Sequence, residues 1–218
     1  MSSPKTKLHL GCGTIYLPGY INIDYPLDQQ TSQHAPQTPV DLYADITTLH
    51  YETDSVEEVR LHHVFEHFDR PTALRLLVEW YDWLGEGGTL TIETPDFDRC
   101  VKAYLFGNTS AKGRALRHIF GSHDAHWAVH YDGWGKSKFK SYLTALGYGN
   151  IKFKFTAWRG TYNITVQVKK TPPFTSLVER KQVAEKLLRM SLVDDSPTEQ
   201  KVLSVWMKSF NSSKNQID

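Results

Sequence analysis

Apolar residues along this chain follow two alternating patterns. Short apolar runs, typical of buried strands, are separated by segments in which apolar positions recur every three or four residues, the spacing of an amphipathic helix. The strands predicted in this way are 7–10, 20–24, 40–44, 58–64 and 88–93. Strands that alternate with helical segments predict an α/β domain built on a mostly parallel sheet.

The clearest predicted helix spans residues 71–84. Pro71 suits a first helical turn, and Gly85 suits a helix stop. The apolar positions of this segment share one predicted buried face: Ala73, Leu74, Leu77, Trp80, Tyr81 and Leu84. Further along, apolar and polar residues alternate in 150–158 and again in 161–170, with Arg159-Gly160 between them. That arrangement predicts a β-hairpin.

Two segments lie outside this frame and suggest a division of the chain into a main domain, 1–170, and a C-terminal extension, 171–218. Within the main domain, residues 107–136 form a long aromatic-rich insertion before a predicted helix at 137–146, and we expect the insertion to cover a binding site. The extension carries amphipathic helices at 177–192 and 197–210 and a polar tail from Asn211. These helices either pack on the domain or form a homodimer or partner-enzyme contact.

The first candidate binding site lies at the start of the chain. The first strand runs into Gly11 and Gly13, whose missing Cβ atoms let a ligand approach the backbone, and the second strand ends on Asp24. A carboxylate there can accept hydrogen bonds from both ribose hydroxyls. Tyr16 stands where a dinucleotide fingerprint has its third glycine, and Asp24 follows Gly13 by 11 residues rather than by roughly 20. The motif therefore favours an adenosine-bearing cofactor without a pyrophosphate.

This start resembles that of the class I S-adenosylmethionine-dependent methyltransferases, most closely small single-domain members associated with glycan and polysaccharide biosynthesis. The matching pieces are LHLGCG, LPGYINID, ADI at 44–46, HVFEHF at 63–68 and GEGGTLTIETPDF at 85–97, within 7–170. The resemblance implies a Rossmann-like, doubly wound, seven-stranded sheet that ends in an antiparallel hairpin, with S-adenosylmethionine as cofactor. It implies cofactor contacts from Leu10, Gly11, Cys12, Gly13, Asp24, Asp45, Ile46 and His63.

Two of these positions have another interpretation. Asp45 and Ile46 resemble the pair that binds adenine in the family, but Asp45 also suits a helix N-cap. Cys12 lies between two glycines, and its position favours the role of a small residue in a tight turn over that of a nucleophile.

A first histidine group, His62, His63, Glu66 and His67, follows the fourth predicted strand, where the ligand crevice of a parallel sheet lies. Its H-x-x-E-H spelling also matches a metalloprotease motif, but that motif requires a helix and this one follows a strand. In a subset of the resembling methyltransferases, E-x-x-E-H and a distant histidine hold a divalent ion. Here His63 replaces the first Glu, so the match is partial, and Glu66 capping the next helix is the alternative.

A second group, His118, His123, His126 and His130, lies in the insertion. His130 falls where the resembling family often has a histidine, as general base or as last metal ligand; its alternative is a surface histidine in a polar loop. We predict that Glu66, His67 and His130 converge on the transferable methyl group, as catalytic residues or around Mg²⁺ or Mn²⁺.

Composition narrows the choice of partners and compartment. The chain has 218 residues, 40% hydrophobic, with a net charge of +1. That charge gives no general attraction for polyanions and argues against a nucleic-acid substrate. Neither a membrane span nor a signal peptide is predicted. The two cysteines form no disulfide framework, so we expect a cytoplasmic protein.

These observations together predict an O-methyltransferase that acts on a hydroxyl group, preferably of a carbohydrate or glycan. Trp127, Tyr131 and Trp134 of the insertion are candidates to stack against sugar faces. The alternatives are an N-methyltransferase, a nucleic-acid 2′-O-methyltransferase or a non-catalytic scaffold with a cofactor fold. The Asn/Asp-Pro-Pro-Tyr signature of N-methylation is absent.

Overall fold

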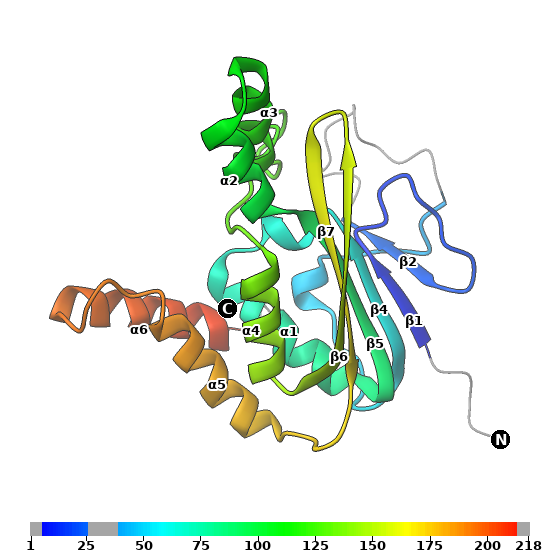
Figure 1. Ribbon diagram of the computed structural model, residues 1–218. Helices are drawn as coiled ribbons and strands as arrows, with labels where there is room; N and C mark the ends of the chain where they lie inside the picture. Colours follow the sequence, from blue (N-terminus) through cyan, green and yellow to red (C-terminus); the bar gives the residue numbers. More distant parts are fainter. Residues whose placement is uncertain (1–5, 26–38, 213–218) are drawn as a thin grey trace.

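A computed structural model describes residues 6–25 and 39–212 (Figure 1). Residues 213–218 of the predicted polar tail lie outside the described part. The described residues form one seven-stranded sheet in the order β3-β2-β1-β4-β5-β7-β6. The strands are β1 (Thr6–Leu10), β2 (Ile21–Asp24), β3 (Leu42–Tyr43), β4 (Val56–His62), β5 (Leu84–Pro95), β6 (Tyr148–Trp158) and β7 (Thr161–Lys170).

The sheet is parallel from β3 to β5, and β7 joins it antiparallel to β5 and to β6. This topology confirms the predicted Rossmann-like fold with a terminal hairpin. Arg159 and Gly160 both have positive φ, 48° and 81°, as the two central residues of a tight hairpin turn of this type require.

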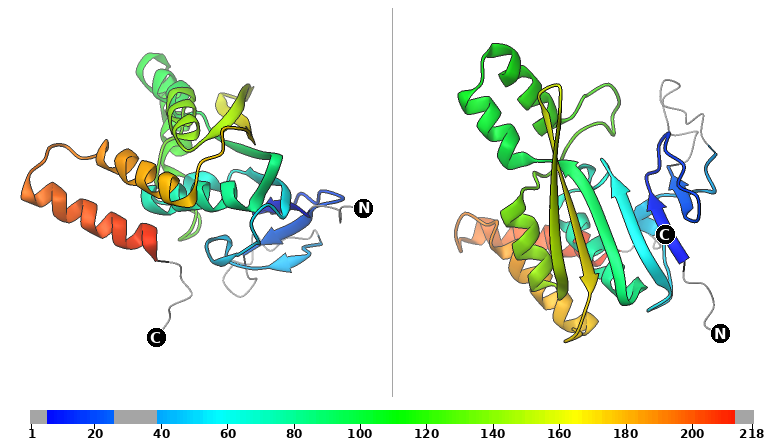
Figure 2. Two further views of the ribbon diagram at one scale, coloured as in Figure 1. Left: turned by 90° about the horizontal axis from the view of Figure 1, so that it is seen from below. Right: turned by 45° about the vertical axis from the view of Figure 1, so that its right-hand side comes forward.

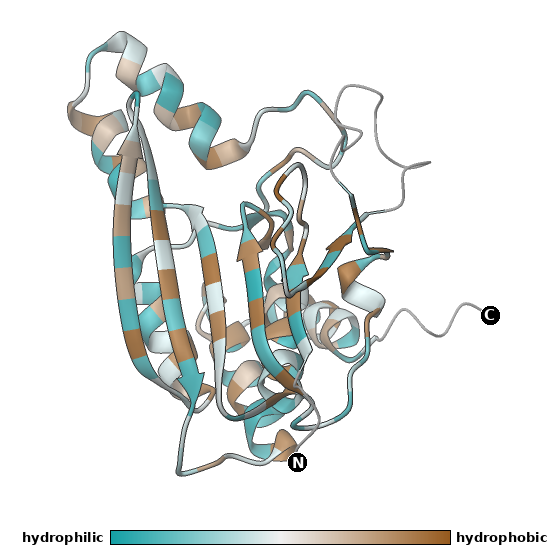
Figure 3. Ribbon diagram, turned by 90° about the vertical axis from the view of Figure 1, so that its right-hand side faces the viewer, coloured by the Kyte–Doolittle hydropathy of each residue, from teal (hydrophilic) through white to brown (hydrophobic). Residues whose placement is uncertain are grey.

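The helices of the described residues are α1 (Arg70–Trp83), α2 (Phe97–Phe106), α3 (Thr109–Phe120), α4 (Lys136–Ala145), α5 (Leu177–Arg189) and α6 (Pro197–Asn211), with short 3₁₀ turns at η2 (Ile46–Thr48) and η3 (Phe65–His67). Helices α1, α4, α5 and α6 lie on one face of the sheet, behind it in Figure 3. The alternate strand residues that face them are apolar and buried, among them Leu8, Leu61, Leu90, Ile92 and Val166. None of the described helices is both long and apolar enough to cross a membrane.

Helix α1 begins and ends one residue before the predicted range 71–84. The Asp69 carboxylate accepts a hydrogen bond from the Thr72 N–H at 2.9 Å and so caps the first turn. The predicted end at Leu84, with Gly85 after it, is one residue too late, because the helix ends at Trp83 and β5 starts directly at Leu84. Leu84 pairs with Val56 of β4, so sheet pairing decides this boundary.

The two remaining helical pairs differ in how they join the domain. Helices α5 and α6 pack against α1, and the buried Arg180 of α5 forms an ion pair with Asp82. Through these contacts residues 177–211 pack on the rest of the described chain. Helices α2 and α3 instead project beside the β6–β7 turn, at the top of Figure 1 and of the right-hand view of Figure 2.

Candidate functional site

The predicted site residues lie where neighbouring strands end. Because β2, β1, β4 and β5 are adjacent and parallel, their carboxyl ends meet at one edge of the sheet. Leu10 ends β1, Asp24 ends β2, and His63 follows β4. The crevice at such an edge is where ligands bind in open α/β sheets.

The glycine loop after β1 is held against both neighbouring strands. The Gly11 N–H donates to the Ile23 carbonyl at 2.8 Å, and the Gly13 N–H donates to Asp24 Oδ2 at 2.7 Å. Gly11 has φ +68°, and a Cβ there would lie 2.3 Å from Val64 Cγ2, so only glycine fits. The loop therefore turns tightly between β2 and the segment after β4.

Asp24 is oriented by the backbone on both of its oxygens. Oδ2 accepts from Gly13, and Oδ1 accepts from the Tyr25 N–H at 2.7 Å. A carboxylate oxygen has more than one acceptor position, so these bonds leave capacity for further donors. Burial, together with the charge of Asp24, raises the pKa of the Cys12 thiol to about 11. Cys12 is thus a protonated, buried residue of the turn, in line with its non-nucleophilic interpretation.

Asp45 is engaged in a local cap. Its Oδ1 accepts from the Thr47 N–H at 2.8 Å and from the Thr47 hydroxyl at 2.6 Å, at the start of η2. At least one carboxylate oxygen of Asp45 therefore has the N-cap role that was the alternative to adenine binding. Ile46 is 7% exposed and belongs to the hydrophobic core, which leaves it little surface to offer an adenine ring.

Glu66 and His67 are adjacent in sequence, and His130, about sixty residues later, meets them in space. One ligand atom from each lies within 4.8 Å of those of the other two. Buried Phe65 anchors η3 between Trp80 and Trp134 and so positions Glu66 and His67. The Tyr131 N–H donates to the Glu66 carbonyl at 2.9 Å and brings His130 alongside.

Both histidines are held in the same tautomer. His67 Nδ1 lies 3.0 Å from the Val129 carbonyl, and His130 Nδ1 lies 3.0 Å from the His118 carbonyl. A carbonyl only accepts, so each Nδ1 carries the proton and, in the neutral ring, Nε2 carries the lone pair. Burial lowers the pKa of His130, against the opposing charge of Glu66, and favours the neutral ring.

Glu66 is 2% exposed, and its two oxygens have different surroundings. Oε1 lies 3.2 Å from His63 Nδ1, whereas the buried Oε2 has no hydrogen-bond partner among the described residues. His63 Nε2 in turn lies 3.8 Å from Glu93 Oε1. Although burial opposes it, the hydrogen bond to Glu66 and the charges of Glu66 and Glu93 raise the pKa of His63. His63 thus acts as a partner of Glu66 rather than as a third ring facing His67 and His130.

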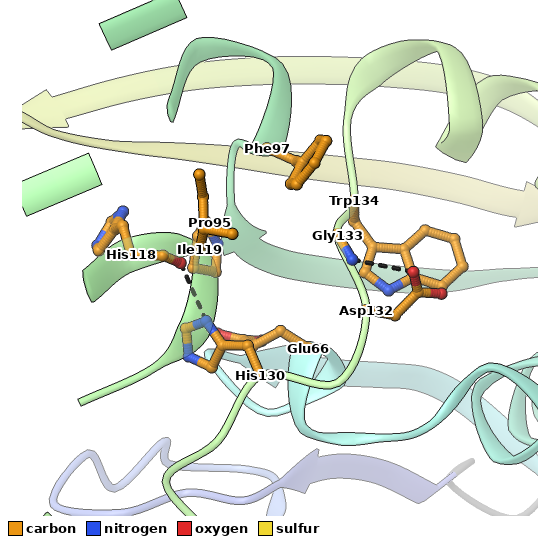
Figure 4. Close-up of a pocket in the computed structure, with 9 residues that line it drawn as sticks. All are labelled: Glu66, Pro95, Phe97, His118, Ile119, His130, Asp132, Gly133 and Trp134. Carbon is orange, nitrogen blue, oxygen red and sulfur yellow. Dashed lines mark hydrogen bonds between the residues drawn. The ribbon is translucent and has the colours of Figure 1, made fainter. Parts of the chain in front are cut away.

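A cavity of about 10 Å³ borders Glu66 and His130 (Figure 4). That volume suits one water-sized occupant. Phe97 at the start of α2 and His118 and Ile119 near the end of α3 form part of its wall. Of these residues the sequence patterns singled out His118, but not Phe97, Ile119 or the nearby Glu93. A carboxylate at the end of a central strand is the signal by which Glu93 could have been found.

The three aromatic residues proposed for sugar stacking have different environments. Trp134 is 1% exposed and stacks with Phe139 at 4.9 Å and against Phe65 at 4.8 Å. The prediction that Trp134 meets an acceptor is therefore wrong, because the core needs its large apolar ring. Trp127 and Tyr131 are 36% and 61% exposed, and Trp127 lies against His67 with ring centroids 6.4 Å apart.

Comparison with known proteins adds the fold family. No family model and no curated protein matches the chain. Among solved structures, a SAM-dependent methyltransferase from Archaeoglobus fulgidus superposes with a TM-score of 0.53 at 15% identity, over 77% of this chain and 87% of that one. One from Methanosarcina mazei gives 0.50 at 12% identity, over 78% and 94%.

A possible exported protein from Bordetella parapertussis gives a TM-score of 0.50 at 14% identity, and the match covers 77% of this chain and 63% of that one. At such identities the likeness concerns the backbone. The chain has the fold of the class I S-adenosylmethionine-dependent methyltransferases.

Proposed function

We propose that this protein is an S-adenosylmethionine-dependent O-methyltransferase. The observation that carries the proposal is the convergence of Glu66, His67 and His130 beside the glycine loop, at the edge of the sheet where Asp24 also lies. In this proposal Asp24 accepts hydrogen bonds from the ribose hydroxyls, and Gly11 and Gly13 let the cofactor approach the backbone. The cofactor, when bound, supplies a methyl group on a positively charged sulfur.

The acceptor hydroxyl loses its proton to this histidine pair. The Nε2 atom of His67 or His130 is the available base, because each Nδ1–H is already donated to a carbonyl. Val129 and His118 keep the rings oriented through their backbone, so the base is in place before the acceptor binds. Methyl transfer to the hydroxyl oxygen is a direct displacement that needs no covalent intermediate with the protein, so positioning of the two substrates supplies most of the catalysis.

The same three residues have the composition of a divalent metal site. The orphaned, buried Oε2 of Glu66 fits a cation, since an unpartnered buried carboxylate oxygen is costly. The backbone carbonyls on both Nδ1 atoms are the outer contacts that metal-binding histidines require. Two imidazoles and one carboxylate favour Mn²⁺ over Mg²⁺. A divalent ion there would lower the pKa of a coordinated hydroxyl.

We further propose a carbohydrate hydroxyl as the acceptor. Trp127 and Tyr131 are exposed and lie on the same loop segment as His130. Their rings can stack against the faces of a sugar. Trp127 adjoins His67, so a sugar stacked there would present its hydroxyls near the base.

Cofactor binding is tested by calorimetry with S-adenosylhomocysteine. We expect binding and a raised melting temperature, and no such effect from NAD. Asp24→Asn should weaken binding by about tenfold or more, since it replaces the charged acceptor of two hydrogen bonds. Glu57→Gln, at an exposed ion pair with Lys7, is the matched control and should bind normally. Unchanged affinity in the Asp24 variant would contradict the assignment.

The metal is tested separately by titrating Mn²⁺ into the cofactor-loaded protein. Glu66→Gln and His130→Gln should each lose Mn²⁺ binding while S-adenosylhomocysteine still binds. His118→Gln is the control, because it alters the same cavity wall but keeps the carbonyl that orients His130. If the parent does not bind Mn²⁺, the pair acts as a plain base, and activity should survive chelation.

A further inference from the structure

Positive charge is unevenly distributed along this nearly neutral chain. Residues 99–123 and 133–178 contain 13 of the 25 Lys and Arg residues and no Asp or Glu. The first stretch comprises α2 after its first turn and α3, and the second contains α4, β6 and β7. The net charge of +1 is therefore the sum of a basic part, these two stretches, and an acidic part, the rest of the chain. The acidic residues that border these two stretches are Asp98, in the first turn of α2, Asp124, Asp132 and Glu179.

The same elements expose large apolar side chains. In α2 and α3, all of whose residues are described, only Cys100 and Ala115 are buried. Phe106 is 84% exposed and Leu105 57% exposed at the end of α2, and Trp158 beside the β6–β7 turn is 67% exposed. Apolar residues exposed together on cationic elements indicate an interaction surface.

The end of α2, helix α3 and the β6–β7 turn form one continuous surface. Lys102, Phe106 and Tyr162 line one open hollow between α2 and β7. The Arg114 guanidinium of α3 lies against the turn, with its Nε 2.8 Å from the position of a Cβ on Gly160. Figure 1 shows these elements at the same end of the molecule. We name this the tip surface; it comprises Lys102, Leu105, Phe106, Arg114, Trp158, Arg159 and Tyr162.

We propose that the tip surface binds the interface of an anionic lipid bilayer. Its protruding Phe and Trp side chains enter the boundary between headgroups and acyl chains, and its Lys and Arg side chains meet the anionic headgroups. Such a surface holds a protein on a membrane without any spanning helix.

A single-stranded nucleic acid is the competing polyanion, and the aromatic rings argue against it. The Arg159 guanidinium lies over the Trp158 ring at 4.7 Å, and Arg99 lies over Tyr162 at 4.6 Å. Each of these rings thus has a face already covered by a cation, whereas nucleic-acid platforms stack bases on ring faces. The exposed aliphatic side chain of Leu105 can contact acyl chains but offers no favourable contact to a phosphate backbone.

Helices α2 and α3 connect the tip surface to the candidate site. Phe97 at one end of α2 and Ile119 near the end of α3 line the cavity beside Glu66 and His130, while Phe106 lies at the other end of α2. In combination with the proposed function, this places the acceptor site near a bilayer. The membrane proposal itself stands on the tip surface alone and needs no methyltransferase activity.

The test is co-sedimentation of the full chain with vesicles of phosphatidylcholine, with and without phosphatidylglycerol. We expect binding to the anionic vesicles that weakens with salt, and little binding to the neutral ones. Arg159→Gln should weaken binding about fivefold, and Phe106→Ser with Trp158→Ser about tenfold or more. Val193→Ser, an 89% exposed apolar residue between α5 and α6, is the control and should bind like the parent.

Insertion depth is followed by quenching of tryptophan fluorescence with brominated lipids. Trp158→Phe should keep vesicle binding and lose the quenching, which separates insertion from mere adsorption. Melting curves of each variant exclude misfolding. Equal binding to both kinds of vesicle, normal binding by the double serine variant, or tight binding to an oligonucleotide without binding to vesicles would each overturn the proposal.

Discussion

Two helical pairs of this protein, α2–α3 and α5–α6, are built from similar amphipathic segments but differ in what surrounds them. Helices α5 and α6 bury Leu187, Leu188 and Phe210 against the domain. Helices α2 and α3 leave Phe106, which is 84% exposed, and comparable side chains on the surface. An apolar helix face therefore indicates that something covers it, and only the fold shows whether the cover comes from the same chain.

The largest expected difference between the pairs concerns aromatic truncation. Phe210→Ala should lower the free energy of unfolding by about 3–5 kcal/mol, because it opens a cavity in α6 packing. Phe106→Ala should change it by less than about 0.5 kcal/mol, because the ring is exposed. Urea denaturation measures both. A similar loss in both variants would mean that α2 is covered after all.

A smaller difference is expected from the helix caps. Ser176 and Glu179 form a reciprocal capping box at the start of α5, so Ser176→Ala should cost about 1 kcal/mol in global stability. Asn108 caps α3 through the Ala111 N–H at 2.9 Å. Asn108→Ala should speed hydrogen exchange in α3 while leaving the urea midpoint unchanged, because that helix buries little. A shifted midpoint would show that α3 unfolds together with the core.

The smallest effect is the acid sensitivity that the Glu179 carboxylate gives to the start of α5. Hydrogen bonds from the Ser176 backbone N–H and hydroxyl lower the pKa of Glu179 below its usual 4.5. The stabilisation by this carboxylate is therefore complete above pH 4.5 and is lost as the pH falls through the lower, folded-state pKa. In Glu179→Gln this component of acid sensitivity should disappear, whereas Asn108→Ala should keep it. Melting curves between neutral and acidic pH compare the two variants.

Much of the fold was predictable because its signals are local. The alternation in β6 and β7, with Arg159-Gly160 between them, and the caps and periodicity of α1, α5 and α6 depend on neighbouring residues. Helix α1 ends one residue before the predicted Leu84, because Leu84 pairs with Val56, a residue distant in sequence. The prediction that Trp134 contacts an acceptor was wrong for a similar reason, since its aromatic neighbours come from η3 and α4.

In the candidate site, too, some residues could be identified from local sequence and others only from the tertiary structure. Gly11, Gly13 and Asp24 were identifiable by themselves, since a positive φ and a carboxylate at a strand end are properties of short segments. His130 could be suspected, but its approach to Glu66 and His67 depends on the loop after α3 returning to η3 through the Tyr131–Glu66 hydrogen bond. Local backbone preference thus determined the strands, turns and glycine loop from sequence. Tertiary packing decided which histidines meet, which tryptophan is buried and which helical pair stays uncovered, because each depends on partners that short-range sequence patterns do not specify.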